Sequence, residues 1–343
     1  MTPFMGSSVN LAIPTIGKQF GAGAFELGWV VTGYLLASAA FLLPFGKAAD
    51  ILGRRKVFQA GIVSFLISSC LCGLSPTIEV LIATRVLQGI SSAMIFGTGI
   101  AILTSVFPAA ERGRVLGINS ASVYVGLSMG PVVGGALNHY LGWQSIFFAN
   151  AAIGLIALYF VRKLKGEWIG APGEKFDFRG SVLYSAGLIL LMYGVSSLTN
   201  SSWAVTCILV GAATLIVFAF YEMRQKYPLF NFRLFIGNTT FTFSNIASLI
   251  NYSASFAVGY LLSIYLQTVS GIDSQSAGFI LLAQPIVMAV LSPVTGRLSD
   301  TVSCRKLASA GMAVTVVALL AFSQIGVGTG FAFLVFSLMI FGA

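Results

Sequence analysis

The sequence predicts an all-α polytopic membrane protein, one that crosses the bilayer many times. Charged residues make up 8% and hydrophobic residues 57% of its 343 residues, whereas about a quarter of the residues in an ordinary soluble domain are charged. Apolar segments recur up to the last residue, so they are not one signal peptide followed by a polar mature chain. The lengths of these segments match membrane-spanning helices.

Twelve apolar runs lie between charged or Gly- and Pro-rich breaks, and most are close to the roughly 20 residues that a spanning helix needs. We expect spans at residues 2–17, 27–45, 57–75, 79–107, 115–137, 143–161, 179–198, 203–221, 239–269, 275–295, 307–325 and 330–343. The first and last runs are short for a span. Because the chain begins and ends inside an apolar run, we expect sequence to be missing at both ends.

The basic residues predict the orientation, because Lys and Arg accumulate in cytoplasmic loops. Alternate loops hold 17 of the 19 basic residues, and only Lys18 and Arg85 lie elsewhere. We therefore expect a multi-pass protein of the plasma membrane with the loop at residues 46–56 on the cytoplasmic side. This pattern also explains the net charge of +9 without a nucleic-acid partner, whose binding would require one basic patch.

Metal, cofactor and enzyme chemistry are not expected. The four cysteines are Cys70, Cys72, Cys207 and Cys304. The first two lie one residue apart without two further partners for a zinc site, and core packing of a small apolar thiol explains all four. An intramembrane enzyme would need a nucleophile or a metal set inside the bilayer, and the single histidine, His139, falls at the outer end of the fifth span.

A repeated loop predicts a duplicated transporter. The loop GKAADILGRRK at residues 46–56 matches GRLSDTVSCRK at residues 296–306 as G-x-x-x-D-x-x-x-x-R-K, 250 positions later. Such internal repeats are typical of transporters. The second loop follows span 10 rather than span 8, so two extra spans must separate the halves. We expect a six-helix N-terminal bundle at residues 1–165, a linker with two inserted spans at 166–222, and a partial C-terminal bundle at 223–343.

The residues of the two loops fit a conformational latch. Glycines permit tight turns, and Asp50 can accept backbone N–H groups or pair with Arg54 or Arg55. A charge cluster between two helix ends can hold one arrangement of the helices and release another, although a solvated loop obeying the charge rule is the simpler alternative. The predicted latch residues are Gly46, Asp50, Gly53, Arg54 and Arg55, with Gly296, Arg297 and Asp300 in the second copy. Ser303 and Cys304 replace the second glycine and arginine there, so we expect that latch to be weaker.

Span 5 contains the segment GLSMGPVVGG at residues 126–135. Gly126, Gly130 and Gly134 lie four apart and form one smooth face against which another helix can pack closely. Pro131 interrupts the hydrogen-bond ladder and predicts a kink, and Gly135 adds a further small residue. A static packing surface is the simplest use of such a face, and the proline and the paired Gly134 and Gly135 make the segment more specific than a bare glycine repeat.

Arg85 lies about six residues into span 4, in LIATRVLQG at residues 81–89. It either extends to the outer surface or provides a charge facing a cavity, with Gln88 one turn on and Gly89 easing helix contact. The residues alone leave both readings open.

These segments resemble the major facilitator superfamily. GKAADILGRRKV resembles its signature loop, RVLQG its fourth-span motif, and GLSMGPVVGG the fifth-span motif of its drug antiporters. With VNLAIPTI at 9–16, WVVTGYLLA at 29–37, WQSIFFANAAIG at 143–154 and PLFNFRLF at 228–235, the pattern is similar to the fourteen-span drug:proton antiporter family. The resemblance implies two six-helix bundles with two extra central helices, an incomplete C-terminal bundle, and alternating access to a central cavity. It also implies that span 5 is a gating helix, with Gly126, Gly130, Pro131, Gly134 and Gly135 at the interface that opens and closes. The match of RVLQG to the fourth-span motif favours the cavity charge for Arg85.

The resemblance implies a secondary transporter that exports small lipophilic or drug-like compounds in exchange for protons. We expect a small-molecule substrate, protons and the lipid bilayer as partners, and a monomer. In many family members an acid precedes the asparagine of VN by five residues, and Met5 stands there, so Arg85 would be paired with substrate, water, Glu26 or Glu79. A facilitator or uptake carrier of a metabolite or anion, with no proton antiport, is the alternative.

The ten acidic residues lie outside the middle of the expected spans, so none is an evident proton carrier there. Those in or beside cytoplasmic loops are Asp50, Glu111, Glu167, Glu174, Asp177, Glu222 and Asp300, and those near outer ends are Glu26, Glu79 and Asp273. Polar and aromatic residues within the spans are candidates for contacting substrate, because an aromatic cavity with few charges suits lipophilic compounds. These candidates are Asn10, Trp29, Tyr34, Asn119, Tyr252 and Gln284.

Overall fold

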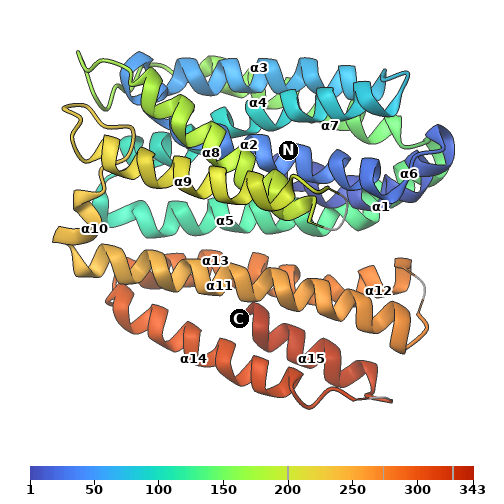
Figure 1. Cartoon of the computed structure of the whole chain (residues 1–343). Helices are drawn as coiled ribbons and strands as arrows, with labels where there is room; N and C mark the ends of the chain where they lie inside the picture. The colour runs from blue at the N-terminus through green and yellow to red at the C-terminus, as the bar shows by residue number, and fades with distance from the viewer. Residues whose placement is uncertain (199–200, 273, 327) are drawn as a thin grey trace. The chain divides into compact units, whose positions relative to one another are not determined.

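A computed structural model describes residues 1–198, 201–272, 274–326 and 328–343, and the regular structure of these residues is entirely helical (Figure 1). The prediction of an all-α protein is confirmed. In chain order the longer helices are α1 (Thr2–Phe20), α2 (Ala24–Leu52), α3 (Arg54–Gly73), α4 (Ile78–Val106), α5 (Arg112–Met129), α7 (Gln144–Lys163), α8 (Phe178–Ser196), α9 (Ala204–Glu222), α11 (Thr239–Ile264), α13 (Ala283–Ser299), α14 (Cys304–Phe322) and α15 (Phe331–Gly342). Shorter elements are η1 (Ala109–Glu111), η2 (Gly130–Gly134), α6 (Gly135–Leu141), α10 (Arg233–Gly237), η3 (Tyr265–Val269) and α12 (Ser274–Leu281).

Each expected apolar run coincides with a helix or with consecutive helical elements. Within the described residues, ten helical segments are long and apolar enough to cross a membrane, and Phe331–Gly342 is a shorter apolar helix. The first run is longer than expected, because α1 has 19 residues and ends where Gly21 adopts a left-handed conformation with φ 62°. Only glycine enters that conformation at little cost.

Two spans contain a π-helical segment that the sequence pattern did not predict. Span 5 is interrupted at Gly130–Gly134, where Pro131 lies inside a π-helical turn, and span 9 ends in the π-helical segment Tyr265–Val269. Pro131 has no N–H to give to the α-helical ladder, and π-helical turns are frequent at functional sites of helices. The expected interruption at Pro131 is therefore present as a change of helix type.

The chain divides into two compact units. Unit 1 comprises Met1, Ala12–Ser105 and Leu137–Asn238, and unit 2 comprises Thr2–Leu11, Val106–Ala136 and Thr239–Ala343. In unit 1, α3 packs along α7, α8 along α9, and α2 contacts both α3 and α8. Ile62 and Leu66 of α3 meet Ala151 and Leu158 of α7 in a buried apolar cluster.

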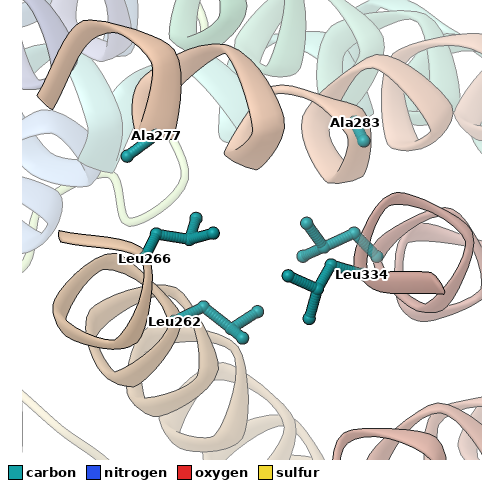
Figure 2. Close-up of a cluster of buried hydrophobic side chains, with 6 residues drawn as sticks. Leu262, Leu266, Ala277, Ala283 and Leu334 are labelled. Carbon is teal, nitrogen blue, oxygen red and sulfur yellow. The ribbon is translucent and has the colours of Figure 1, made fainter. Parts of the chain in front are cut away.

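Unit 2 is organised around α13, which packs along α5 and contacts α14 and α15. Figure 2 shows Leu262 and Leu266 pointing toward Leu334, with Ala277 and Ala283 beside them. These units differ from the expected bundle limits, because the start of α1 and all of α5 group with the C-terminal helices. The division into bundles at residues 165 and 222 remains a prediction.

Candidate functional site

Arg85 lies within unit 1 on α4 and is 1% exposed. Its Nε donates to the carbonyl oxygen of Val30 at 2.9 Å, and its Nη1 donates to Oε1 of Gln88 at 2.5 Å. The guanidinium carbon lies 4.2 Å from the centroid of the Tyr34 ring, within the range of a cation–π interaction. The side chain therefore does not extend to the outer surface, which excludes that alternative.

The groups around Arg85 continue the network without a carboxylate. Gln88 donates from Nε2 to Oγ of Ser69 at 2.7 Å, and the hydroxyls of Tyr34 and Ser92 share a hydrogen bond of 2.9 Å. The expected partners Glu26 and Glu79 do not contact the guanidinium in the described structure: Glu79 is exposed and bonds to Thr77. A cation is thus held by a carbonyl, an amide and an aromatic face.

Gly89 brings α4 against α2 and so places Tyr34 beside Arg85. A Cβ on Gly89 would meet the Tyr34 carbonyl oxygen far inside van der Waals distance and would lie 2.9 Å from the Ala37 Cβ. No larger residue fits at this position without separating the helices. The structure therefore brings Arg85, Gln88 and Gly89 together with Tyr34, the four residues that we call the Arg85 cluster.

The expected loop at residues 46–56 is helical except at Gly53, because α2 runs to Leu52 and α3 starts at Arg54. Charge pairs hold this junction of the two helices. Asp50 Oδ1 accepts hydrogen bonds from Nε and Nη2 of Arg54, both at 2.8 Å, and Arg54 Nη1 also donates to the carbonyl oxygen of Ala101 at 3.0 Å. Arg54 thereby connects the end of α2 to the end of α4. Of the partners that the sequence left open for Asp50, which were backbone N–H groups, Arg54 and Arg55, the carboxylate pairs with Arg54.

The linker at residues 164–177 binds the segment at residues 46–56. The sequence did not predict this contact. Lys47 Nζ and Glu174 Oε2 form an ion pair of 2.5 Å, and the Arg55 N–H donates to Oε1 of Glu167 at 2.8 Å. Gly53 has φ 115°, and a Cβ there would collide with the Glu167 carboxyl. The loop is therefore packed rather than freely solvated. Gly46 plays a smaller part, because a Cβ on it would meet open space.

The second loop copy acts on a helix N-terminus in unit 2. The Asp300 carboxylate accepts from the backbone N–H groups of Gly113 and Arg114, at 2.8 and 2.9 Å. These donors belong to the first turn of α5, where an anion is favoured by the helix dipole. Gly117 Cα and the ideal Cβ position of Gly296 are 2.8 Å apart, so α5 and α13 approach closely.

The glycine face of span 5 packs against the first half of α1 within unit 2. A Cβ on Gly130 would collide with the Ser7 side chain and lie 3.0 Å from the Ser8 nitrogen, and a Cβ on Gly134 would lie 2.6 Å from Ser8 Oγ. Ser8 Oγ also donates to the Gly130 carbonyl oxygen at 3.4 Å. Gly126 and Gly135 have looser neighbours, at 3.5 and 3.7 Å. Gly130 and Gly134 therefore form the closest part of this contact.

The residues expected to contact substrate fall in different surroundings. In unit 1, Tyr34 belongs to the Arg85 cluster, and the Trp29 ring lies 5.7 Å from that of Tyr193. In unit 2, Asn10 and Tyr252 are exposed, while Asn119 and Gln284 are half-buried. Asp273 lies outside the described residues. The role of these residues in substrate binding remains a prediction.

Unit 2 contains a hollow of about 860 Å³ that the sequence did not indicate. Residues of α11, α14 and the end of α15 line it, among them the polar residues Ser248, Asn251, Arg305 and Thr315. It is large enough for a drug-sized molecule, since ligand pockets span about 300–1,000 Å³.

Comparison with known proteins identifies the family of this fold. Residues 1–244 match the family model described as Major Facilitator Superfamily. The chain is 30% identical to the riboflavin transporter RibZ of Clostridioides difficile, over 100% of this chain and 75% of that protein. It is 29% identical to the multidrug resistance protein Stp of Mycobacterium tuberculosis, over 91% of this chain and 59% of that protein.

A solved structure supports the same fold. The proton:xylose symporter XylE, solved with 6-bromo-6-deoxy-D-glucose bound, aligns with a TM-score of 0.66, over 99% of this chain and 75% of that chain. Its sequence identity is 14%, so the likeness concerns the fold alone.

Proposed function

This chain belongs to the major facilitator superfamily, a family of membrane transporters rather than enzymes, and we propose that it exports small lipophilic or drug-like compounds by alternating access. Because the chain spans 75% and 59% of the lengths of RibZ and Stp, the activity of the whole protein is part of the proposal. The similarity to Stp, named as a multidrug resistance protein, supports a drug-like substrate.

One observation carries the proposal: the contact of Gly130 and Gly134 with Ser7 and Ser8. Two helix backbones meet there with only small side chains between them, so no large side chain has to be withdrawn when the helices shift. The π-helical turn at Gly130–Gly134 has a less regular hydrogen-bond ladder than an α-helix, which allows local rearrangement. We assign this segment the role of the gating helix.

The two copies of the repeated segment, at residues 46–56 and 296–306, support alternating access because they can act as latches. Asp50 with Arg54, and Asp300 with the first turn of α5, are charged contacts at helix ends. One such contact stabilises the conformation that contains it by only about 0.3–1 kcal/mol. They can therefore break and re-form in each transport cycle.

We further propose that export is coupled to protons and that the protein works as a monomer in the plasma membrane, with residues 46–56 on the cytoplasmic side. The Arg85 cluster would supply a fixed positive charge beside the substrate pathway. A buried cation without a carboxylate partner attracts an anionic or electron-rich group, which gives the cluster a role in accepting substrate.

A second candidate function is carriage of a metabolite or anion without proton antiport. The absence of a carboxylate from the contacts of Arg85 in the described structure, and Met5 at the position of the family's acid, favour it. RibZ, a riboflavin transporter by name, is similar to this chain over the whole length of this chain and 75% of its own.

Substrate flux in membrane vesicles, measured with and without a pH gradient, tests the proposal. Export coupled to protons requires that the gradient changes the flux of a lipophilic compound. A facilitator moves its substrate at the same rate in both conditions.

A further inference from the structure

Two carboxyl groups face each other in unit 1, where the linker at residues 164–177 meets the helices α8 and α9. Asp177 is the N-cap residue of α8, and Glu222 is the last residue of α9. Glu222 is 2% exposed. One oxygen of each group, Asp177 Oδ2 and Glu222 Oε1, is buried without a hydrogen-bond partner among the described residues.

These two oxygens converge on one point beside Gly180. A Cβ on Gly180 would lie 2.6 Å from Asp177 Oδ2 and closer still to Glu222 Oε1. The two oxygens are therefore within about 5 Å of each other, and the two side chains are within hydrogen-bonding reach. Any residue larger than glycine would collide with both carboxyl groups, so Gly180 is required for them to lie this close to α8.

The other oxygen of each group is satisfied by donors. Asp177 Oδ1 accepts from the Gly180 N–H at 2.8 Å and from the Tyr221 hydroxyl at 3.3 Å, and Glu222 Oε2 accepts from the Phe230 N–H at 3.2 Å. The pair thereby connects three segments: the end of the linker, the end of α9 and the chain at residues 229–230. The two orphan oxygens, close together beside Gly180, have no donor among the described residues.

We propose that Asp177 and Glu222 bind one proton between them and form a proton-binding site with a single negative charge. Two ionised carboxylates at this separation repel each other, and a buried one lacks water to solvate it. One shared proton supplies a short O–H···O⁻ hydrogen bond and satisfies both orphan oxygens at once. The N–H groups of the first turn of α8 stabilise the charge that remains.

A metal cation does not fit the same surroundings. Calcium and magnesium need about six oxygen ligands, whereas the other groups contacting these carboxyls are N–H donors and a tyrosine hydroxyl. The positive end of the α8 dipole also opposes a cation. Among the described residues, no cluster of three or more His, Cys, Asp or Glu side chains is arranged to hold a metal ion.

The other ionisable groups near the pair do not replace the proton. Tyr221 of α9 and Arg179 of α8 lie close to the site and interact with each other electrostatically. On α10, Arg233 donates to the Met223 carbonyl oxygen rather than to either acid. On α2, Lys47 is already paired with Glu174. Arg233 and Lys47 therefore do not bind the orphan oxygens of Asp177 and Glu222.

The proton has a structural consequence for the linker. Glu167 and Glu174 of the linker hold the loop at residues 46–56, and Asp177 ends that linker. Loss of the proton would place two negative charges side by side and loosen the junction. This inference does not depend on the proposed transport activity, because the site lies in contacts that the purified chain makes without substrate.

Infrared spectroscopy of the purified full-length chain at neutral pH tests the site directly, because a protonated carboxyl has its own C=O stretching band that shifts in D₂O. We expect one such band in the wild type and its loss in both Glu222→Gln and Asp177→Asn. Glu174→Gln is the matched control, an acid of the same linker already paired with Lys47, and it should keep the band. A wild type without the band, or a band that survives in Glu222→Gln, overturns the proposal.

Hydrogen exchange of the wild type provides a second test, which does not depend on whether a substituted protein folds. As pH rises and the proton leaves, the protection factors of the Gly180 and Phe230 amides should fall by about tenfold, while those in the middle of α3 stay constant. Constant protection at both amides contradicts the proposal. Protection that instead rises on adding sodium or magnesium chloride contradicts it too, since it would identify the site as one for a metal cation.

Discussion

The Nη1 atom of Arg85 lies 2.5 Å from Oε1 of Gln88, one turn further along α4, in a part of the helix where both side chains are buried. Gln88 in turn donates to Ser69 on α3. A charge inside an apolar span is costly unless polar groups surround it, and this pair shows how the chain meets that cost with an amide, a carbonyl and an aromatic ring.

Replacing Arg85 with Gln should impair transport without preventing membrane insertion. Loss of the charge removes the attraction for an electron-rich substrate and leaves the Val30 carbonyl and Gln88 without their donor, at a cost of about 1–3 kcal/mol. We expect at least about a tenfold loss of flux, the factor that corresponds to ~1.4 kcal/mol. Flux at the wild-type rate in correctly inserted Arg85→Gln would remove Arg85 from the transport mechanism.

Replacing Gly89 with Ala should destabilise unit 1. The added methyl group meets the Tyr34 carbonyl oxygen and the Ala37 methyl, and overpacking of this kind costs about 1–3 kcal/mol. Thermal unfolding in detergent should show a lower midpoint. Gly259→Ala on α11 is the control, because a Cβ there meets nothing within 4 Å and should leave the midpoint unchanged or raise it. Equal midpoints for the two variants would contradict the close approach of α4 and α2.

Replacing Gly130 with Ala should slow transport more than it affects folding. The methyl group would press on Ser7 and Ser8 and hold the two helices in one relative position. We expect at least about a tenfold lower flux with normal insertion. Gly6→Ala is the control: Gly6 lies on α1 beside Ser7, but a Cβ there meets nothing within 4 Å, so this variant should transport as the wild type does. A Gly130→Ala variant with wild-type flux would make this contact a static one.

Replacing Asp300 with Ala should weaken the first turn of α5. The carboxylate serves two N–H groups there, and loss of a helix cap costs about 0.5–2 kcal/mol. Faster hydrogen exchange at Gly113 and Arg114 should report the change. Glu111→Ala is the matched control, because Glu111 precedes the same helix without a side-chain cap bond. Unchanged exchange in Asp300→Ala would show that solvent supplies these bonds equally well.

The helices were predictable because span length follows from bilayer thickness, and each apolar run coincides with helical structure. Gln88 was predictable as a neighbour of Arg85, since residues three apart share a helix face. Asp50 and Arg54 are four positions apart, on either side of the helix break at Gly53, so their pairing is local too. These are local relationships, which the order of residues fixes within one or two turns.

The remaining contacts depend on tertiary structure. Val30 and Tyr34 reach Arg85 only because Gly89 lets α2 approach α4, and Glu167 reaches Arg55 only because the linker folds back over 112 positions of sequence. The carboxyl pair of Asp177 and Glu222 comes from two helices that pack side by side. The sequence places both acids in or beside cytoplasmic loops, and no local pattern indicates that their buried oxygens come together beside Gly180.

The central claim, proton-coupled export by alternating access, is tested most directly by flux of a fluorescent lipophilic compound in vesicles containing the full chain. Inverted vesicles with an acidic interior should accumulate the compound, and collapse of the pH gradient or the Gly130→Ala substitution should abolish accumulation. Equal movement of the compound with and without the gradient, unaffected by Gly130→Ala, would contradict the account.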